Sequence, residues 1–134
     1  MLGHARSSNL AAYQSAAAHG GVAASDPHRL IVMLLDGAIE RIATARGCMQ
    51  RSETAEKGRL INRAISIVGE LRTSLDLRNG GQIAANLAEL YDYICRRLLR
   101  ATTDNRIEML DEVSGLLHEI RSAWLAIAPE ARAR

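Results

Sequence analysis

Apolar residues recur every three or four positions through four long stretches of this chain, and short polar or glycine-containing breaks separate the stretches. That spacing places apolar side chains on one face of a helix, whereas a strand needs alternation with a period of two. No stretch alternates for long enough to predict a strand. The sequence therefore predicts four amphipathic helices, over about 25–51, 59–77, 82–101 and 106–128.

Long helices joined by short loops must lie antiparallel to their neighbours. Each predicted helix would span about 30–39 Å at ~1.5 Å per residue. The expected fold is all-α, an antiparallel up-down four-helix bundle over residues 25–128. Residues 1–24, rich in Ala, Ser, Gly and His, are expected to form a mobile N-terminal arm, and residues 129–134 a frayed C-terminal tail.

The breaks between the stretches contain residues typical of helix ends. Ser25 is predicted to be the N-cap of the first helix, with Pro27 in its first turn. The polar run 53–58 predicts a loop, and a glycine of Asn79-Gly80-Gly81 is expected to supply the left-handed residue that ends the second helix. Residues 102–105 are predicted to form a turn that caps the fourth helix.

The third helix carries two of the chain's three tyrosines, Tyr91 and Tyr93. Two residues apart, they point about 200° apart around the helix, which can therefore face two partners. Tyr93 is expected on the side away from the bundle, and Tyr91 fits either side. The helix is expected to build the bundle mainly with Ile83, Leu87, Leu90 and Ile94.

Composition excludes several classes of protein. The 134 residues fit one domain, and a net charge of +2 is far from the strong basic bias of a nucleic-acid-binding domain. Cys48 and Cys95 are isolated and lack CxxC spacing, which indicates reduced thiols in a reducing compartment. No apolar run is long enough to span a membrane, and no signal peptide is evident. We expect a cytoplasmic protein that does not insert into membranes.

The sequence contains no pattern typical of a catalytic, cofactor or metal site. A di-metal site in a bundle needs Glu-x-x-His pairs, and none occurs. P-loop and GxGxxG motifs are also absent. Asp92 is expected to pair with Arg96 one turn later, and the Arg96-Arg97 pair is expected to meet acids of the fourth helix. No catalytic residue, metal or cofactor is predicted.

The apolar residues exceed what one seam per helix requires. Ile31 and Leu35 lie off the main stripe of the first helix, and Leu10 and Tyr13 would form one apolar patch in the arm. Surplus apolar surface on a small protein indicates a partner. Long helices suit an extended or helical peptide, and a homodimer that buries the same surface is the alternative.

Three segments carry a resemblance to a known family. They are residues 24–38 (ASDPHRLIVMLLDGA), residues 79–93 (NGGQIAANLAELYDY) followed by Arg96-Arg97-Leu98, and residues 112–117 with Trp124. With these segments the chain resembles the FliS-type flagellin export chaperones over nearly its whole length. It departs from the family at Asp26, which precedes Pro27 where the family usually has Ser-Pro, and in its longer, glycine-rich arm.

The resemblance implies a cytoplasmic four-helix bundle that binds the disordered C-terminal region of flagellin. Such a chaperone blocks premature polymerisation and keeps flagellin competent for the flagellar type III export apparatus, whose gate protein FlhA receives the complex. The resemblance also implies that residues 8–24 occupy part of the binding surface until flagellin displaces them. Leu10 and Tyr13 would then serve in capping and gate docking.

The expected partner-binding residues come from the arm and from all but the last helix. They are Leu10, Tyr13, Ile31, Leu34, Leu35, Leu75, Leu77, Ile83, Asn86, Leu87, Leu90, Tyr91, Tyr93, Ile94 and Arg97. An anti-sigma factor or a co-chaperone is a further possible partner, and the expected state is a monomer or weak homodimer. The alternatives are a homodimeric adaptor or regulatory protein without a client, and an enzyme with a site hidden in the bundle.

Overall fold

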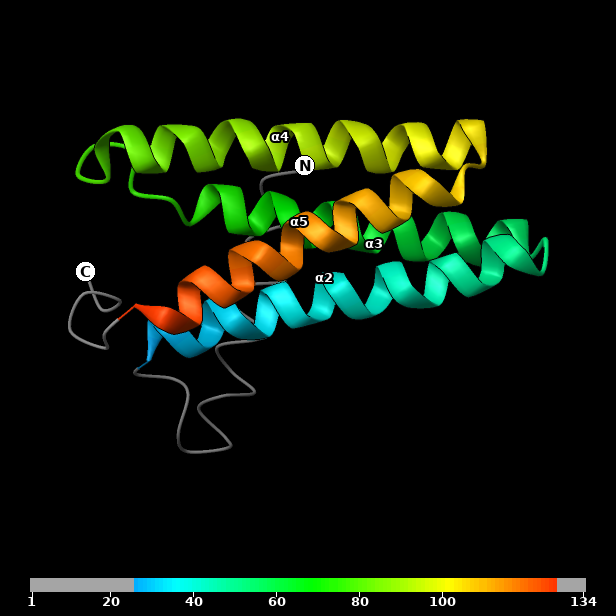
Figure 1. Cartoon of the computed structure of the whole chain (residues 1–134), viewed down its shortest axis with the longest axis horizontal. Coiled ribbons are helices and arrows are strands. Elements are labelled where there is room, and N and C mark those ends of the chain that lie inside the picture. The colour runs from blue at the N-terminus through cyan, green and yellow to red at the C-terminus, as the bar shows by residue number, and fades with distance from the viewer. Residues whose placement is uncertain (1–25, 128–134) are drawn as a thin grey trace.

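The computed structural model describes residues 26–127, and within them it contains four long helices and no strand. The helices are α2 (Pro27–Gln50), α3 (Thr54–Thr73), α4 (Gly81–Asp104) and α5 (Ile107–Ala126). The chain runs back and forth along one axis, so consecutive helices are antiparallel (Figure 1). The predicted all-α up-down bundle is confirmed, and the predicted arm and tail lie outside the described residues.

One apolar core lies between the helices. Helices α2 and α4 each pack mainly against α3 and α5. Because α3 and α5 both bridge the other two helices, the apolar faces of all four meet at the centre. Every helix contributes at least one large side chain with no exposed surface, as shown by Leu34, Ile61, Ile94 and Leu110.

Helix α2 begins one residue later than predicted. Its N-cap is Asp26, whose carboxylate Oδ1 accepts hydrogen bonds from the backbone N–H of His28 at 3.1 Å and of Arg29 at 3.3 Å. Pro27 occupies the first helical position, where a missing N–H costs nothing. The prediction that Ser25 caps this helix is wrong, because the adjacent carboxylate takes the role.

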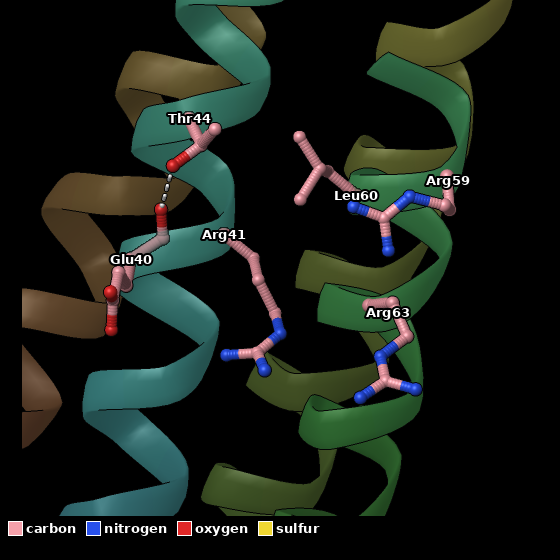
Figure 2. A pocket seen from close by; sticks show the side chains of 6 residues that line it. All are labelled: Glu40, Arg41, Thr44, Arg59, Leu60 and Arg63. Atoms are coloured by element: carbon pink, nitrogen blue, oxygen red, sulfur yellow. Dashed lines mark hydrogen bonds between the residues drawn. The ribbon is translucent and has the colours of Figure 1, made fainter. Parts of the chain in front are cut away.

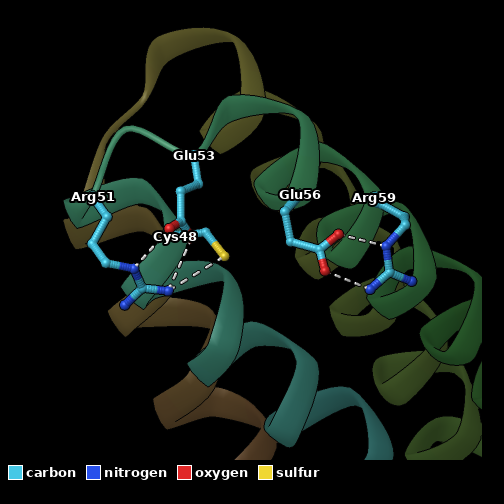
Figure 3. Close-up of polar contacts among 5 residues, drawn as sticks. All are labelled: Cys48, Arg51, Glu53, Glu56 and Arg59. Atoms are coloured by element: carbon cyan, nitrogen blue, oxygen red, sulfur yellow. Dashed lines mark hydrogen bonds and ion pairs between the residues drawn. The ribbon is translucent and has the colours of Figure 1, made fainter.

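The connection between α2 and α3 is short and is held by side-chain contacts. Arg51 donates from Nε to Glu53 Oε2 at 3.2 Å and from Nη2 to Cys48 Sγ at 3.8 Å (Figure 3). The hydrogen bond from Arg51 lowers the pKa of Glu53. Burial raises the pKa of the Cys48 thiol, and Glu53 adds to that shift. Both effects favour a protonated thiol, which fits a structural side chain.

The first turns of α3 contain a buried lysine that ties α3 to the end of α4. Lys57 is only 3% exposed, and its Nζ donates to the Thr102 carbonyl at 3.3 Å and to Asn105 Oδ1 at 2.9 Å. Asn105 adopts the left-handed conformation, with φ 55°, that ends α4. Two predictions are therefore wrong: 53–58 is mostly helical, and α4 continues to Asp104 through the predicted turn.

The connection between α3 and α4 uses both glycines, but not as predicted. Helix α3 ends at Thr73, and its C-cap Ser74 has ordinary right-handed backbone. The left-handed residue is Gly81, with φ 56°, at the start of α4. A Cβ on Gly80 would lie 2.6 Å from the Asp76 carbonyl oxygen, so only glycine fits that position. The turn shapes the entry to α4 rather than the exit from α3.

Candidate functional site

Polar contacts at three positions attach α5 to α2. Arg46 Nε lies 2.7 Å from Asp111 Oδ1, and Arg121 pairs with Asp36 ten residues earlier on α2. Near the end of α5, Trp124 Nε1 donates to a backbone carbonyl in the first turn of α2 at 3.2 Å. These contacts draw the second half of α5 toward the start of α2, and away from the start of α4 (Figure 1).

Besides their contact in the core, α5 and α4 are joined by a polar cluster near the middle of α4. The Tyr93 hydroxyl donates to Glu112 Oε2, and Arg97 Nε donates to Glu112 Oε1 at 2.8 Å. The hydrogen bond from Tyr93, followed by that from Arg97, lowers the pKa of Glu112. The same carboxylate raises the pKa of the Tyr93 hydroxyl. Arg97 therefore meets an acid of α5, as predicted. Tyr93 was expected to face away from the bundle, but it is half-buried and hydrogen-bonded to Glu112 of α5.

The first half of α4 exposes apolar side chains beyond this cluster. Ile83 is 75% exposed. Leu87 and Leu90 on the following turns pack partly against the core, as predicted, and keep part of their surface exposed. In the preceding connection Leu77 is 51% exposed, and Leu75 is partly buried against the core. We call these five residues, Leu75, Leu77, Ile83, Leu87 and Leu90, the apolar strip. The prediction that Ile83 builds the bundle is wrong, because α5 leans away from the start of α4.

Four predicted contact residues lie inside the core instead. Leu34, Leu35 and Ile94 have no exposed surface, and Tyr91 is 4% exposed. Burial raises the pKa of the Tyr91 hydroxyl to about 12. These side chains have almost no surface to offer a partner, because neighbouring helices already cover them. The ambiguity over Tyr91 is thereby resolved in favour of the core.

The other predicted contact residues outside the strip differ in accessibility. Ile31 is partly buried against the core, and Asn86 is exposed, with its side-chain oxygen accepting from Gln82 Nε2 at 2.8 Å. Leu10 and Tyr13 lie outside the described residues. Tyr93 and Arg97 are likewise partly exposed. Accessible predicted surface thus remains on the apolar strip, on Asn86 and, in part, on Ile31, Tyr93 and Arg97.

Two features were missed or misassigned from the sequence. Leu99 is 62% exposed on α4, although it was not predicted to be a surface residue. The adjacent pair Leu98-Leu99 was the available signal, since neighbouring side chains on a helix point about 100° apart and both cannot face the core. Asp92 pairs with Arg72 of α3 at 2.8 Å, rather than with Arg96.

No cluster of three or more His, Cys, Asp or Glu side chains that could hold a metal occurs within residues 26–127. None of the four helices in that range combines the length and apolar composition that crossing a bilayer requires. The first half of α4 is distinguished by exposed apolar surface, chiefly that of Ile83.

Comparison with known proteins decides the family. The family described as "Flagellar protein FliS" matches residues 9–131. The chain belongs to the FliS family. The match begins before Leu10, so it covers both arm residues that were predicted to contact partners.

Several relatives align over most of the FliS-family chain. The flagellar secretion chaperone FliSB of Pseudomonas aeruginosa is 47% identical over 116 residues, which cover 87% of this chain and 92% of the relative. The flagellar secretion chaperone FliS of Salmonella typhimurium is 41% identical over 125 residues, which cover 92% and 93%. The relative of the same name in Bacillus subtilis is 33% identical over 98 residues, which cover 73% and 72%. The resemblance stated from the three sequence segments is confirmed, and it places the chain among flagellar secretion chaperones.

Proposed function

We propose that this FliS-family chain binds the disordered C-terminal region of flagellin in the cytoplasm, prevents its premature polymerisation and assists its delivery to the flagellar type III export apparatus. The observation that carries the proposal is the apolar strip. Ile83 and Leu77 are mostly exposed at one end of a bundle whose core is otherwise well packed. Exposed large apolar side chains grouped in this way are typical of a partner surface.

The geometry of the strip suits a client that folds on binding. Ile83, Leu87 and Leu90 recur at helical spacing on successive turns of α4, and Leu75 and Leu77 extend the surface into the preceding connection. A helical or extended segment could lay its apolar side chains along such a row. A disordered client loses much conformational entropy when it becomes ordered, so it needs a long surface rather than one pocket.

The arm has a separate role in the proposal, which rests on the family resemblance. Leu10 and Tyr13 would cover part of the client surface in the free chaperone and would be displaced by flagellin. The released arm would then be available to FlhA at the export gate. An anti-sigma factor or a co-chaperone would be a further partner of the same chaperone.

Calorimetric titration with the C-terminal segment of flagellin tests the proposal directly. We expect binding at micromolar concentrations, with a negative heat-capacity change because apolar surface becomes buried. A flagellin segment in which the apolar residues are replaced by serine is the control, and it should not bind. Absence of binding by the native segment would refute the proposal.

The second candidate is a homodimeric adaptor, which would bury the same strip against a second copy. Light scattering across a dilution series separates the two. A chaperone with an available strip should be monomeric, or dissociate on dilution to a monomer. A dimer that persists at all concentrations and excludes the flagellin segment would favour the adaptor.

A further inference from the structure

A pocket of about 280 Å³ lies between α2 and α3, on a face that the proposed function does not use. Its lining residues are Glu40, Arg41, Thr44, Arg59, Leu60 and Arg63 (Figure 2). Three of these six side chains are guanidinium groups, contributed from both sides of the seam between the helices. The pocket therefore combines a concave shape with a local excess of positive charge.

Two of the three arginines retain hydrogen-bond donors. Arg41 donates from Nη1 to the Gly37 carbonyl at 3.0 Å, which leaves the rest of its guanidinium free to bond. Arg63 is exposed and has no ion pair with any acid in the part of the chain that the structure describes. The Arg41 guanidinium lies in the space between the two helices, and Arg63 lines the same pocket from α3 (Figure 2).

The third arginine is already paired. Arg59 Nε and Nη2 donate to the two oxygens of Glu56 at 2.6 and 2.8 Å, in the two-pronged geometry that a guanidinium prefers with a carboxylate (Figure 3). This pair lowers the pKa of Glu56 and raises that of Arg59. The pair shows that a carboxylate at the edge of this pocket can accept two parallel hydrogen bonds from one arginine.

The acid in the lining does not neutralise the free arginines. The Glu40 side chain points away from the guanidinium groups of Arg41 and Arg63, and no ion pair joins it to either. The Thr44 hydroxyl is occupied by the Glu40 backbone carbonyl, to which it donates at 3.1 Å. The unpaired donors at this seam are therefore cationic, and Leu60 supplies an apolar wall beside them.

We propose that this pocket, which we call the arginine seam, docks an acidic peptide segment of a partner protein, with carboxylates bound by Arg41 and Arg63. Guanidinium groups match carboxylates in shape and charge. The wall formed by Leu60 fits the methylene groups of a glutamate side chain. Nucleic acid is a poorer match, because no aromatic side chain lines the pocket to stack on a base.

The arginine seam is separate from the apolar strip. It lies around residues 40–44 of α2 and 59–63 of α3, toward the end of the bundle where those two helices join. The strip lies around the α3–α4 connection at the opposite end (Figure 1). A partner on the seam could therefore be bound while a client occupies the strip, and the inference goes beyond the proposed function.

The test uses a fluorescently labelled polyglutamate peptide, with polyglutamine as the uncharged probe, and the full-length chain. Fluorescence anisotropy should show weak, salt-sensitive binding of polyglutamate and none of polyglutamine. Replacing Arg41→Gln and Arg63→Gln together should weaken polyglutamate binding about tenfold, roughly threefold for each arginine. The matched control is the pair Arg96→Gln and Arg100→Gln on α4, which removes the same charge elsewhere and should change the affinity less than twofold, because long-range effects are screened.

Three outcomes would overturn the proposal. They are equal weakening by the seam and control variants, absence of polyglutamate binding, and tighter binding of a single-stranded oligonucleotide at the same salt concentration. Thermal unfolding checks that the variants fold, which the exposure of Arg63 leads us to expect. If the double variant unfolds, Arg63→Gln alone and Arg63→Lys decide: the first should lose affinity about threefold, and the second should keep part of it because charge remains without the fork.

Discussion

The exposure of Ile83 gives a prediction that separates client binding from folding. Ile83→Ala removes three carbons, worth about 2.4 kcal/mol if all of them pass from water into an apolar contact at ~0.8 kcal/mol per group. Ile83 is 75% exposed, so about 1.8 kcal/mol of that can be gained only when a client covers it. The variant should therefore bind the flagellin segment about 20-fold more weakly.

The same change should hardly lower the free energy of unfolding. The quarter of Ile83 that is already covered is worth at most about 0.6 kcal/mol, and alanine's better helix propensity returns roughly 0.4 kcal/mol of it. Ile94→Ala makes the identical chemical change where no surface is exposed, and it should lower the free energy of unfolding by about 2–5 kcal/mol. Urea unfolding of the two variants measures this contrast.

A third variant tests whether the loss of any exposed apolar side chain would weaken binding of the client. Leu99 is 62% exposed on the same helix but lies beyond the polar cluster of Tyr93 and Glu112, outside the strip. Leu99→Ala should leave the affinity for the flagellin segment within about twofold of the parent, as expected for a residue outside the interface. If Ile83→Ala binds the client as tightly as the parent does, or if Leu99→Ala loses as much affinity, the strip is not the client surface.

Other parts of the molecule give three further predictions. Lys57→Met removes two charge-assisted hydrogen bonds across α3 and α4, and it should lower the free energy of unfolding in urea by about 1.5–3 kcal/mol, against less than about 0.5 kcal/mol for the exposed control Arg59→Met. Because the folded-state pKa of Glu112 is lowered, its contribution to stability should be present above the ordinary glutamate pKa of about 4.3 and lost as the pH falls below it. The difference in melting temperature between the parent and Glu112→Gln should therefore shrink on acidification, and a constant difference would contradict the assignment. Deleting residues 1–24 should leave the helical circular dichroism signal intact but increase binding of a hydrophobic dye, and unchanged dye binding would contradict the capping role of the arm.

Helical periodicity predicted the bundle because it reports which residues share a face, and that information is local. It did not predict which face of α4 points to the core. The stripe of large residues through Ile83 and Leu87 looked like the buried seam, yet the buried positions at the start of α4 are Ala84 and Ala88. Small residues allow close packing, and they carry little weight in a pattern built on large apolar side chains. The buried face of α4 is therefore turned toward Ala84 and Ala88, and Ile83 remains exposed.

Interactions between residues far apart in the sequence explain the other differences. Lys57 lies in a polar run that is typical of a solvated loop, but its ammonium group donates to Thr102 and Asn105, which lie at the C-terminal end of α4 and more than 40 residues away in the sequence. The direction of α5 likewise depends on pairs such as Arg46 with Asp111, each member of which is an ordinary exposed charge when read alone. Such pairs can be recognised only once the helices are placed.

The tilt of α5 links stability to function in this chaperone. An α5 that ran along the full length of α4 would lie beside the first half of that helix and away from the start of α2, unlike the course in Figure 1. The pairing of Arg121 with Asp36, and of Trp124 with the first turn of α2, selects the other arrangement. The Tyr93 and Arg97 bonds to Glu112 join α5 to the middle of α4. The apolar strip is thus left exposed by contacts that stabilise the bundle elsewhere, so within residues 26–127 an apolar surface persists on a well-packed fold.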